Sequence, residues 1–181
     1  MLMKSLKELI NAILNSSENK ELENIKRNPT MIKEITNPTE AQQLAAVRSS
    51  SHAIKYIKEP TKKVRFIALK DDIYNYRYIK SLTKKEQLYL IKEGIRIENI
   101  KRPVEKVQLY ALKWRRASIN DIKNPTEKAQ LITIRKDKEL FLYIKNPTIT
   151  VCQEVARAYC GNIEVPADRR IIKPTQKLVS S

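Results

Sequence analysis

A repeat of about 22 residues constrains the fold of this chain more than any other feature. Six positions, called anchors here, recur at intervals of 22, 22, 21, 22 and 22 residues, and they are Pro38, Pro60, Leu82, Pro103, Pro125 and Pro147. Leu82 is the exception to proline, but its surroundings IKSLTKKEQL align with IKEPTKKVRF and IKNPTEKAQL. A period of this length predicts a stacked array of small structural units.

The recurring phrase Asn-Pro-Thr indicates where helices begin. It occurs at residues 28–30, 37–39, 124–126 and 146–148, and glutamate follows it at Glu40 and Glu127. Asparagine is a common N-cap, proline suits the first helical position, and glutamate suits the capping-box position. We therefore expect each phrase to start a helix, with asparagine as the cap and proline as its first residue.

Apolar residues recur within each unit at helical spacing. A longer first helix carries them six and nine residues after the anchor, as at Leu44 and Val47. A shorter second helix carries them three residues apart, as at Ile54 and Ile57. One short unit cannot bury such a stripe alone, so the units are expected to stack. With only two glycines in the chain, β-hairpins and Gly-rich phosphate loops are disfavoured.

The phrase IKNPTEKAQLITIRKDKELFLYIKNPT resembles short helical repeats of bacterial and bacteriophage proteins that share an NPTE-x-x-Q-L-x-A-V pattern. More distantly, it is similar to HEAT-like repeats. The resemblance implies an all-α fold, an α-solenoid of about six two-helix repeats, and no common chemistry. We expect an N-terminal helical cap at residues 1–37, the repeat array at 38–165 and a basic C-terminal tail at 166–181. The cap is predicted as two helices separated at Ser16 or Ser17, the first having an apolar face within residues 2–14.

The chain is strongly basic, with 36 Lys and Arg against 20 Asp and Glu and a net charge of +16. Ten of the twelve positions that lie three or ten residues after an anchor are basic and none is acidic, whereas composition alone would give about two or three. Since positions seven apart on a helix point almost the same way, the two registers share one edge of the first helices. We call these ten residues the basic stripe: Arg48, Lys63, Lys70, Lys85, Lys92, Lys106, Lys113, Lys128, Arg135 and Arg157.

Helix-dipole pairing, a solvated surface and descent from one duplicated unit are alternative explanations of this pattern. If the stripe has a function, a polyanion with repeated charges is the natural partner. Nucleic-acid backbone fits, and contacts of this kind carry little sequence preference. Arg115 and Arg116 extend the basic cluster beside Lys113.

Aromatic residues and glutamines also occur among these positions. Tyr89, Tyr110 and Trp114 are possible stacking residues. The alternative for Trp114 is a position packed in the turn between helices, which is the commoner outcome for a lone tryptophan. The glutamines recur unchanged, so we expect them to make hydrogen bonds between units instead of reading bases, and they are Gln43, Gln87, Gln108 and Gln130.

The remaining residues argue against catalysis. His52 is the only histidine and is expected in a surface loop, and Cys152 and Cys160 are expected as small buried hydrophobes. These residues form no zinc-ligand pattern, and no carboxylate pair suggests acid–base chemistry, so we expect no enzyme, metal, cofactor or small-molecule substrate. No apolar run approaches the ~20 residues of a membrane span, and a cytoplasmic location is expected.

The alternative function is a protein-binding solenoid, for example a phage-encoded inhibitor of a host or defence complex of the CRISPR type. The basic stripe would then meet an acidic protein surface or a nucleoprotein.

Overall fold

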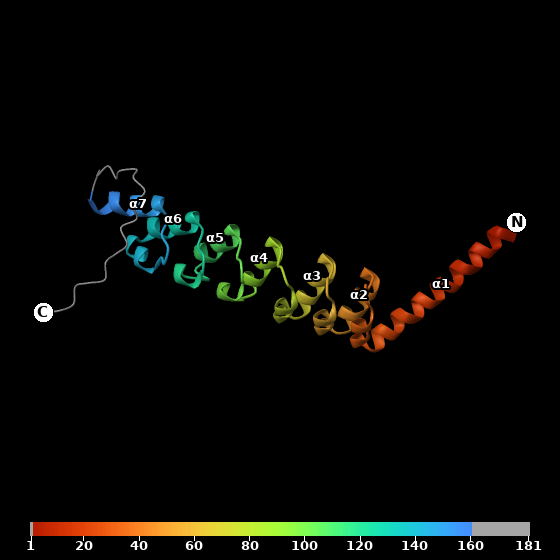
Figure 1. Ribbon diagram of the computed structural model, residues 1–181. Coiled ribbons are helices and arrows are strands. Elements are labelled where there is room, and N and C mark those ends of the chain that lie inside the picture. Colours follow the sequence, from red (N-terminus) through yellow and green to blue (C-terminus); the bar gives the residue numbers. More distant parts are fainter. Residues whose placement is uncertain (1, 161–181) are drawn as a thin grey trace.

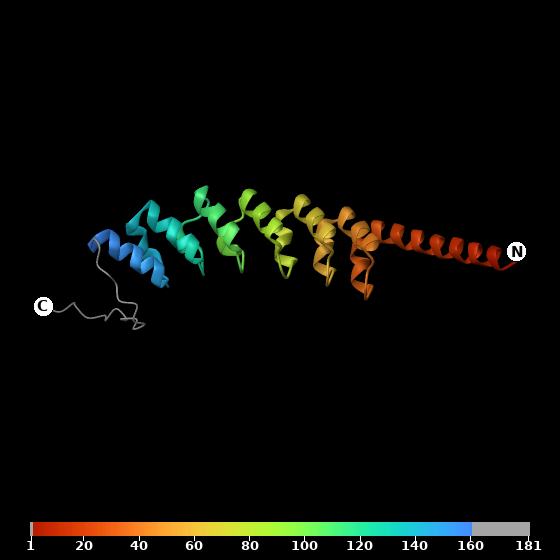
Figure 2. The same ribbon diagram turned by 90° about the horizontal axis from the view of Figure 1, so that it is seen from above.

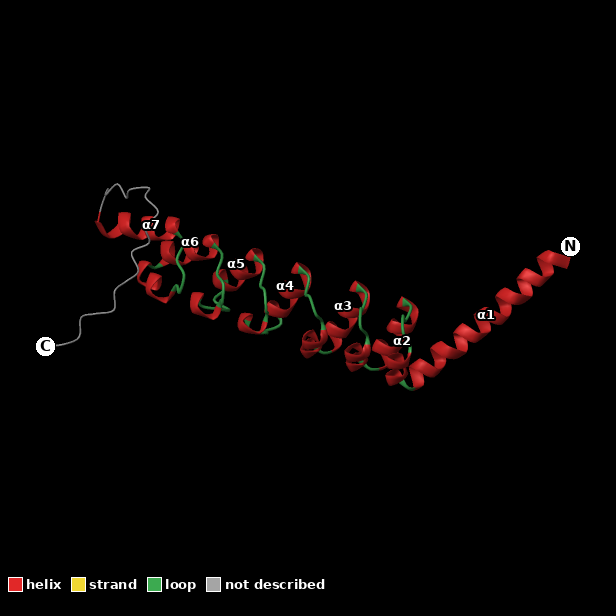
Figure 3. Ribbon diagram, in the orientation of Figure 1, coloured by secondary structure: helices red, strands yellow, loops and turns green. Residues whose placement is uncertain are grey.

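The computed structural model of this chain describes residues 2–160, and every element in that range is a helix. Figure 3 shows these helices in red, joined by short loops in green. The predicted all-α class is therefore confirmed. The end of the sixth unit, residues 161–165, and the predicted C-terminal tail, residues 166–181, lie outside the described residues.

Long α-helices and short 3-10 helices (η) alternate along the chain. The α-helices are α1 (Leu2–Arg27), α2 (Glu40–Ser49), α3 (Lys62–Asp71), α4 (Lys84–Lys92), α5 (Glu105–Lys113), α6 (Glu127–Lys136) and α7 (Ile149–Cys160). The 3-10 helices are η1 (Pro29–Glu34), η2 (Ser51–Tyr56), η3 (Ile73–Tyr78), η4 (Ile97–Asn99), η5 (Ile119–Asp121) and η6 (Lys138–Tyr143). The second helix of each of the first five predicted units is thus a 3-10 helix, and that of the sixth falls outside the described residues.

The units lie side by side in an elongated row (Figure 1). Most neighbouring α-helices contact one another in one layer, and several neighbouring 3-10 helices contact one another in a second, as η1 and η2 do. α3 and α4 share one buried cluster, to which Leu69 and Leu90 both belong. The helix α1 extends from the N-terminal end of the row, and it is in line with the row when seen from above (Figure 2).

The helix α1 is continuous over 26 residues. The predicted break at Ser16 or Ser17 is therefore wrong, because both serines lie inside the helix. Serine costs little within a helix whose neighbouring residues favour helix, and its capping preference acts only where a helix must begin. Leu22 and Ile25 pack the end of α1 against the first core cluster. The side chains of the predicted apolar face within residues 2–14 lie outside the described part of the structure.

The apolar core runs along the row as three adjoining clusters. The isoleucines predicted in the second helices are buried, as at Ile54 and Ile122. In the α-helices the deepest residues lie four and eight positions after the anchor, as at Val107 and Ala111, while Leu109 at the predicted sixth position is half-buried. Partly buried leucines contact two clusters each and so make the core continuous, namely Leu82 and Leu112.

Threonine, and not asparagine, caps five of the α-helices, while α5 has Val104 at this position and no side-chain cap. The Thr126 hydroxyl accepts a hydrogen bond from the Ala129 N–H at 3.4 Å, and the same bond recurs at Thr39, Thr61, Thr83 and Thr148. Asn124 therefore lies before the cap and Pro125 before the helix, so the predicted cap is wrong here. The Thr126 N–H donates to Gln108 of the preceding unit, whereas the Thr39 N–H donates to Gln42 of its own helix, so the threonine caps a helix with or without a glutamine before it. Within the described residues, the phrase at 28–30 differs, since its proline opens η1.

A buried glutamine holds the next unit in place in four of the units. The Gln108 amide donates to the carbonyl oxygens of Pro103 at 2.9 Å and Asn124 at 3.2 Å. Its Oε1 accepts the N–H of Thr126 at 2.8 Å. Corresponding bonds to the next unit are made by Gln43, Gln87 and Gln130. The predicted hydrogen bonding between units is confirmed, and we call this arrangement the glutamine bridge.

Arg65 occupies the glutamine position in the second unit. Its Nη1 donates to the carbonyl oxygen of Ser81 at 3.2 Å, across the same unit boundary that a glutamine would span. Its Nε lies 2.9 Å from Oε1 of the buried Glu86, without the alignment of a hydrogen bond, so this contact is an ion pair. Glu86 Oε2 accepts the N–H of Thr83 at 2.6 Å. Two charged residues thus replace one glutamine bridge.

Candidate functional site

The basic stripe lies entirely on the surface. All ten of its residues are exposed, and so are Arg115 and Arg116, which follow α5. On α3 the two registers are Lys63 in the first turn and Lys70 in the last. Each α-helix from α3 to α6 therefore presents one cation near each end of the same helix edge.

Aromatic rings lie between the lysines of neighbouring units. The Phe66 ring on α3 has Lys70 Nζ at 5.2 Å and Lys85 Nζ, from α4, at 5.1 Å from its centroid. The Tyr89 ring on α4 lies 5.6 Å from that of Phe66. Both lysines make cation–π contacts with the same ring. The tenth position of one unit and the third position of the next therefore meet at the unit boundary.

A second group of rings and lysines follows on α4 and α5. Lys92 Nζ lies 5.7 Å from the centroid of the Tyr110 ring, and Lys113 Nζ lies 5.7 Å from that of Trp114. The two rings are 6.1 Å apart. Trp114 is 60% exposed, so a position packed in the turn is wrong. It follows the last residue of α5, beside the Tyr110 ring, and its exposed part is available for stacking on a planar group.

Most of the stripe has no acidic partner. Lys63 Nζ lies 4.0 Å from Glu40, and Arg135 donates two hydrogen bonds to Glu154, at 2.6 and 3.0 Å. These bonds lower the pKa of Glu154 and raise the pKa of Arg135. The other eight residues of the stripe form no ion pair within residues 2–160. Their charge is therefore available to an external anion.

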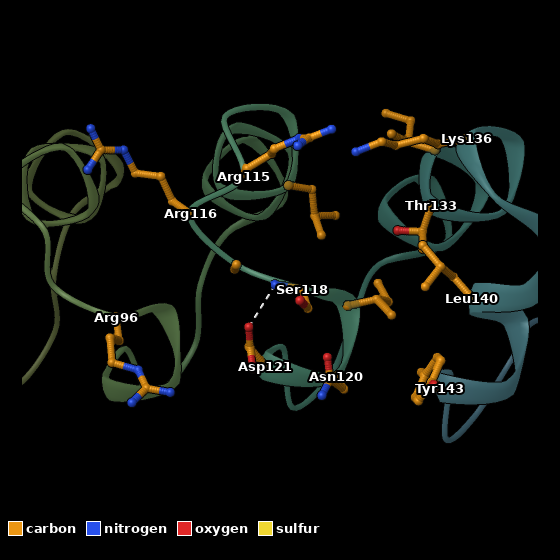
Figure 4. Close-up of a pocket in the computed structure, with 14 residues that line it drawn as sticks. Arg96, Arg115, Arg116, Ser118, Asn120, Asp121, Thr133, Lys136, Leu140 and Tyr143 are labelled. Carbon is orange, nitrogen blue, oxygen red and sulfur yellow. Dashed lines mark hydrogen bonds between the residues drawn. The ribbon is translucent and has the colours of Figure 1, made fainter.

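A pocket of about 750 Å³ lies between α5 and α6 (Figure 4). Its apolar lining comes from α5, η5, α6 and η6, and it includes Leu112, Ile119, Ile132 and Leu140. Its basic lining consists of Arg96, Arg115, Arg116 and Lys136. We call it the α5–α6 pocket. Sequence reasoning placed Arg115 and Arg116 at a nucleic-acid interface but did not detect the pocket.

Arg115 has a backbone conformation that is uncommon for residues other than glycine. Its φ is +52°, and the corresponding residue at the end of α4 is Gly94, with φ +97°. After α5, the Arg116 N–H donates to the carbonyl oxygen of Ala111 at 2.8 Å, which is one bond of a Schellman motif. Glycine adopts this conformation freely, whereas a side chain makes it cost about 1 kcal/mol.

The structure corrects two further predictions. Cys152 and Cys160 are exposed, not buried. Cys152 lies on α7 at the position that glutamine occupies in the glutamine bridges. Because α7 is the last described helix, the described residues include no following unit that Cys152 could contact. His52 is exposed as predicted, but it lies in η2 with its Nε2 3.5 Å from Asp72.

The described residues contain neither a helix suited to a membrane nor a cluster of metal ligands. No helix in residues 2–160 is both long enough and apolar enough to cross a bilayer. Over the same range, no three His, Cys, Asp or Glu side chains gather in a way that could hold a metal ion.

Comparisons of this chain with protein-family models, with curated proteins and with solved structures found no match. The resemblance to short bacterial and phage repeats therefore stays a prediction. A proposal for function has to rest on the surface geometry.

The prediction from sequence assigned Phe66 to the core and missed its contacts with Lys70 and Lys85, which it makes while half-buried. Leucine fills its register in four of the other five units. The available signal was this change from leucine to an aromatic residue next to two lysines. Both Lys136 and Tyr143 line the pocket. Tyr143 shares its register with Tyr56 and Tyr78, each directly before a buried isoleucine, but that repetition did not point to a pocket.

Proposed function

We propose that this chain is an α-solenoid that binds the backbone of DNA or RNA through the basic stripe, with little sequence preference. The meeting of Lys70 and Lys85 at the Phe66 ring carries the proposal, because it joins the cations of two units into one surface. The continuous core and the contacts between neighbouring units support the solenoid. Since the cations recur with each unit, the best partner is one whose anions also recur.

The aromatic residues favour single strands over duplex. Tyr89 and Tyr110 are half-buried and Trp114 is exposed, so the rings can offer faces or edges beside the lysines. Unpaired bases stack on aromatic side chains with little dependence on sequence, and each such contact is worth about 1–3 kcal/mol. A duplex keeps its bases inside and would gain only the phosphate contacts.

Fluorescence anisotropy with random single strands and random duplex, at several salt concentrations, tests the proposal. If about six phosphates are neutralised, log K against log salt should have a slope of roughly −4 for single strands and −5 for duplex. A slope near zero would contradict backbone binding.

A matched pair of variants separates the stripe from net charge. The first carries glutamate at four stripe positions, Lys85, Lys92, Lys106 and Lys113. The second carries glutamate at four exposed lysines outside the stripe, Lys58, Lys80, Lys101 and Lys123. Both variants change the net charge equally, so a difference between them reports the position of the charges. If the stripe is the binding surface, its variant should lose at least about 100-fold more affinity than the control. Equal losses would show that binding depends on overall charge alone, and circular dichroism would verify that both variants fold.

The second candidate function is binding of an acidic protein or nucleoprotein through the stripe. Exposed apolar side chains on η6 and α7 favour it, and they are Leu142, Tyr143, Ile149 and Tyr159, with Leu142 84% exposed. Phosphates gain nothing from such residues, whereas protein interfaces do. A pull-down that captures the same discrete protein with and without nuclease, together with no binding of purified strands, would favour this function.

A further inference from the structure

The α5–α6 pocket combines an apolar lining with a basic edge, and none of the ten stripe residues lines it. We propose that it binds one phosphorylated nucleotide, with the phosphate between Arg115 and Lys136 and the base against the apolar lining. The nucleotide is either free or the phosphorylated end of a strand. This site goes beyond backbone binding by the stripe and does not depend on it.

Two cations converge on one edge of the pocket. Arg115 follows the end of α5 and Lys136 lies in the last turn of α6, and Figure 4 shows their side chains extending toward one another. Neither forms an ion pair within the described residues. Two facing cations repel each other unless an anion lies between them. A phosphate is the best fit, because guanidinium can donate two parallel hydrogen bonds to it.

The other charged residues of the lining do not oppose an anion. Asp121 is the one acidic side chain there, and its Oδ2 already accepts the Ser118 N–H at 2.7 Å, as the dashed line in Figure 4 shows. Arg96 is paired with Glu98 at 2.7 Å. Arg116 points away from the pocket in Figure 4. The edge formed by Arg115 and Lys136 therefore keeps its positive charge.

The rest of the pocket suits a flat, weakly polar group. The apolar residues Leu112, Ile119 and Ile132 come from three elements, and the exposed Tyr143 ring stands at the side. Asn120 is exposed beside them, and its amide can both donate to and accept from a base edge. The volume falls in the range of about 300–1,000 Å³ typical of small-molecule sites. Inorganic phosphate alone would leave these apolar residues uncovered, so a base is needed to use the whole site.

The backbone at Arg115 supports a role for its side chain. Glycine stands at the corresponding position after α4, where it fits the left-handed conformation, yet this unit carries an arginine. Unfavourable backbone conformations persist at functional sites when the side chain is needed. Here the Arg115 side chain extends to the edge of the α5–α6 pocket, where it faces the unpaired Lys136.

Equilibrium dialysis of the full chain with labelled AMP, adenosine and inorganic phosphate tests the proposal. We expect AMP to bind at least about tenfold more tightly than either fragment, because only AMP uses both halves of the site. Arg115→Gly and Lys136→Ala should each weaken AMP binding by about tenfold or more. Lys138→Ala is the matched control, since it removes one charge two residues away and outside the pocket, and it should change binding less than about twofold.

A short single strand with and without a 5′-phosphate distinguishes the two sources. A preference for the phosphorylated strand with weak AMP binding assigns the pocket to strand ends, and tight AMP binding assigns it to free nucleotides. The four-glutamate stripe variant should keep its AMP affinity, so failure of the stripe proposal would leave this result unaffected. The proposal is overturned if AMP binds no better than adenosine and the 5′-phosphate has no effect. It is also overturned if Arg115→Gly and Lys136→Ala bind like the unmodified chain.

Discussion

The glutamine bridge should contribute more to the coupling of neighbouring units than any exposed polar contact, and Gln108→Ala tests this. Gln108 is 2% exposed and makes three hydrogen bonds, two of them to the next unit. Its removal leaves the Thr126 N–H and the Asn124 carbonyl without their partners. A fully buried group left in this state costs about 1–3 kcal/mol, and these two groups are only partly buried, so we expect the free energy of unfolding to fall by about 1–3 kcal/mol.

Urea denaturation followed by circular dichroism at 222 nm measures this loss for the whole array. Trp114 fluorescence reports the same transition at the end of α5, because the chain has only one tryptophan. Glu105→Ala on the same helix is the control, since Glu105 is exposed and its loss should cost less than about 1 kcal/mol. If Gln108→Ala and Glu105→Ala lower the unfolding free energy equally, the reasoning about the bridge is refuted.

Three further predictions concern charged residues. Arg65→Ala leaves the buried Glu86 charge unpaired and should cost about 3–5 kcal/mol in urea denaturation, whereas the double change Arg65→Gln and Glu86→Val should recover most of this by restoring a glutamine bridge. The lowered pKa of Glu154, caused chiefly by the hydrogen bond from Arg135, means that this contact stabilises fully above the ordinary pKa of 4.5. Its contribution is lost as pH falls through the lower folded value, so Glu154→Gln should flatten the acid side of the stability profile. Arg115→Gly should raise the unfolding free energy by about 1 kcal/mol, because it relieves the left-handed backbone, and a lower value would contradict strain at this residue.

The repeat made much of the fold predictable. A residue that recurs at one register has nearly the same surroundings in every unit, so Ile54 and Ile57 indicated the core of all the second helices. The exposure of the basic stripe followed in the same way, and so did the bonding of Gln108 to the next unit.

Features that depend on a bond between units were not predictable from local patterns. The phrase Asn-Pro-Thr fits a helix capped by either asparagine or threonine, and nothing in it indicates that the Thr126 N–H donates to Gln108 of the preceding unit. Arg65 and Glu86 both depart from the repeat, in neighbouring units. This joint departure is consistent with an ion pair, but the sequence does not show that the two side chains meet, and the structure does.

The candidate site was predictable in part. The periodic lysines were expected on one helix edge because they share a register, but the rings between them required the positions of neighbouring units. The α5–α6 pocket depends on how α5 ends at Trp114 and Arg115. The helix α4 ends with the same left-handed turn, but with Gly94 at that position, so an arginine there occurs only once among the described units. A feature present once in a repeat has no second copy with which to compare it.

The bonding of the helix caps bears on how such a chain could gain or lose length. At α2 the Thr39 N–H donates to Gln42 of its own helix at 2.8 Å, so the first repeat needs no glutamine before it. Every later boundary with a glutamine bridge joins a side chain to backbone atoms, which any copy of the unit supplies. Gene duplication could therefore insert a whole 22-residue segment at such a boundary without a compensating mutation. The boundary between Arg65 and Glu86 would not tolerate this, since each half of that pair requires the other.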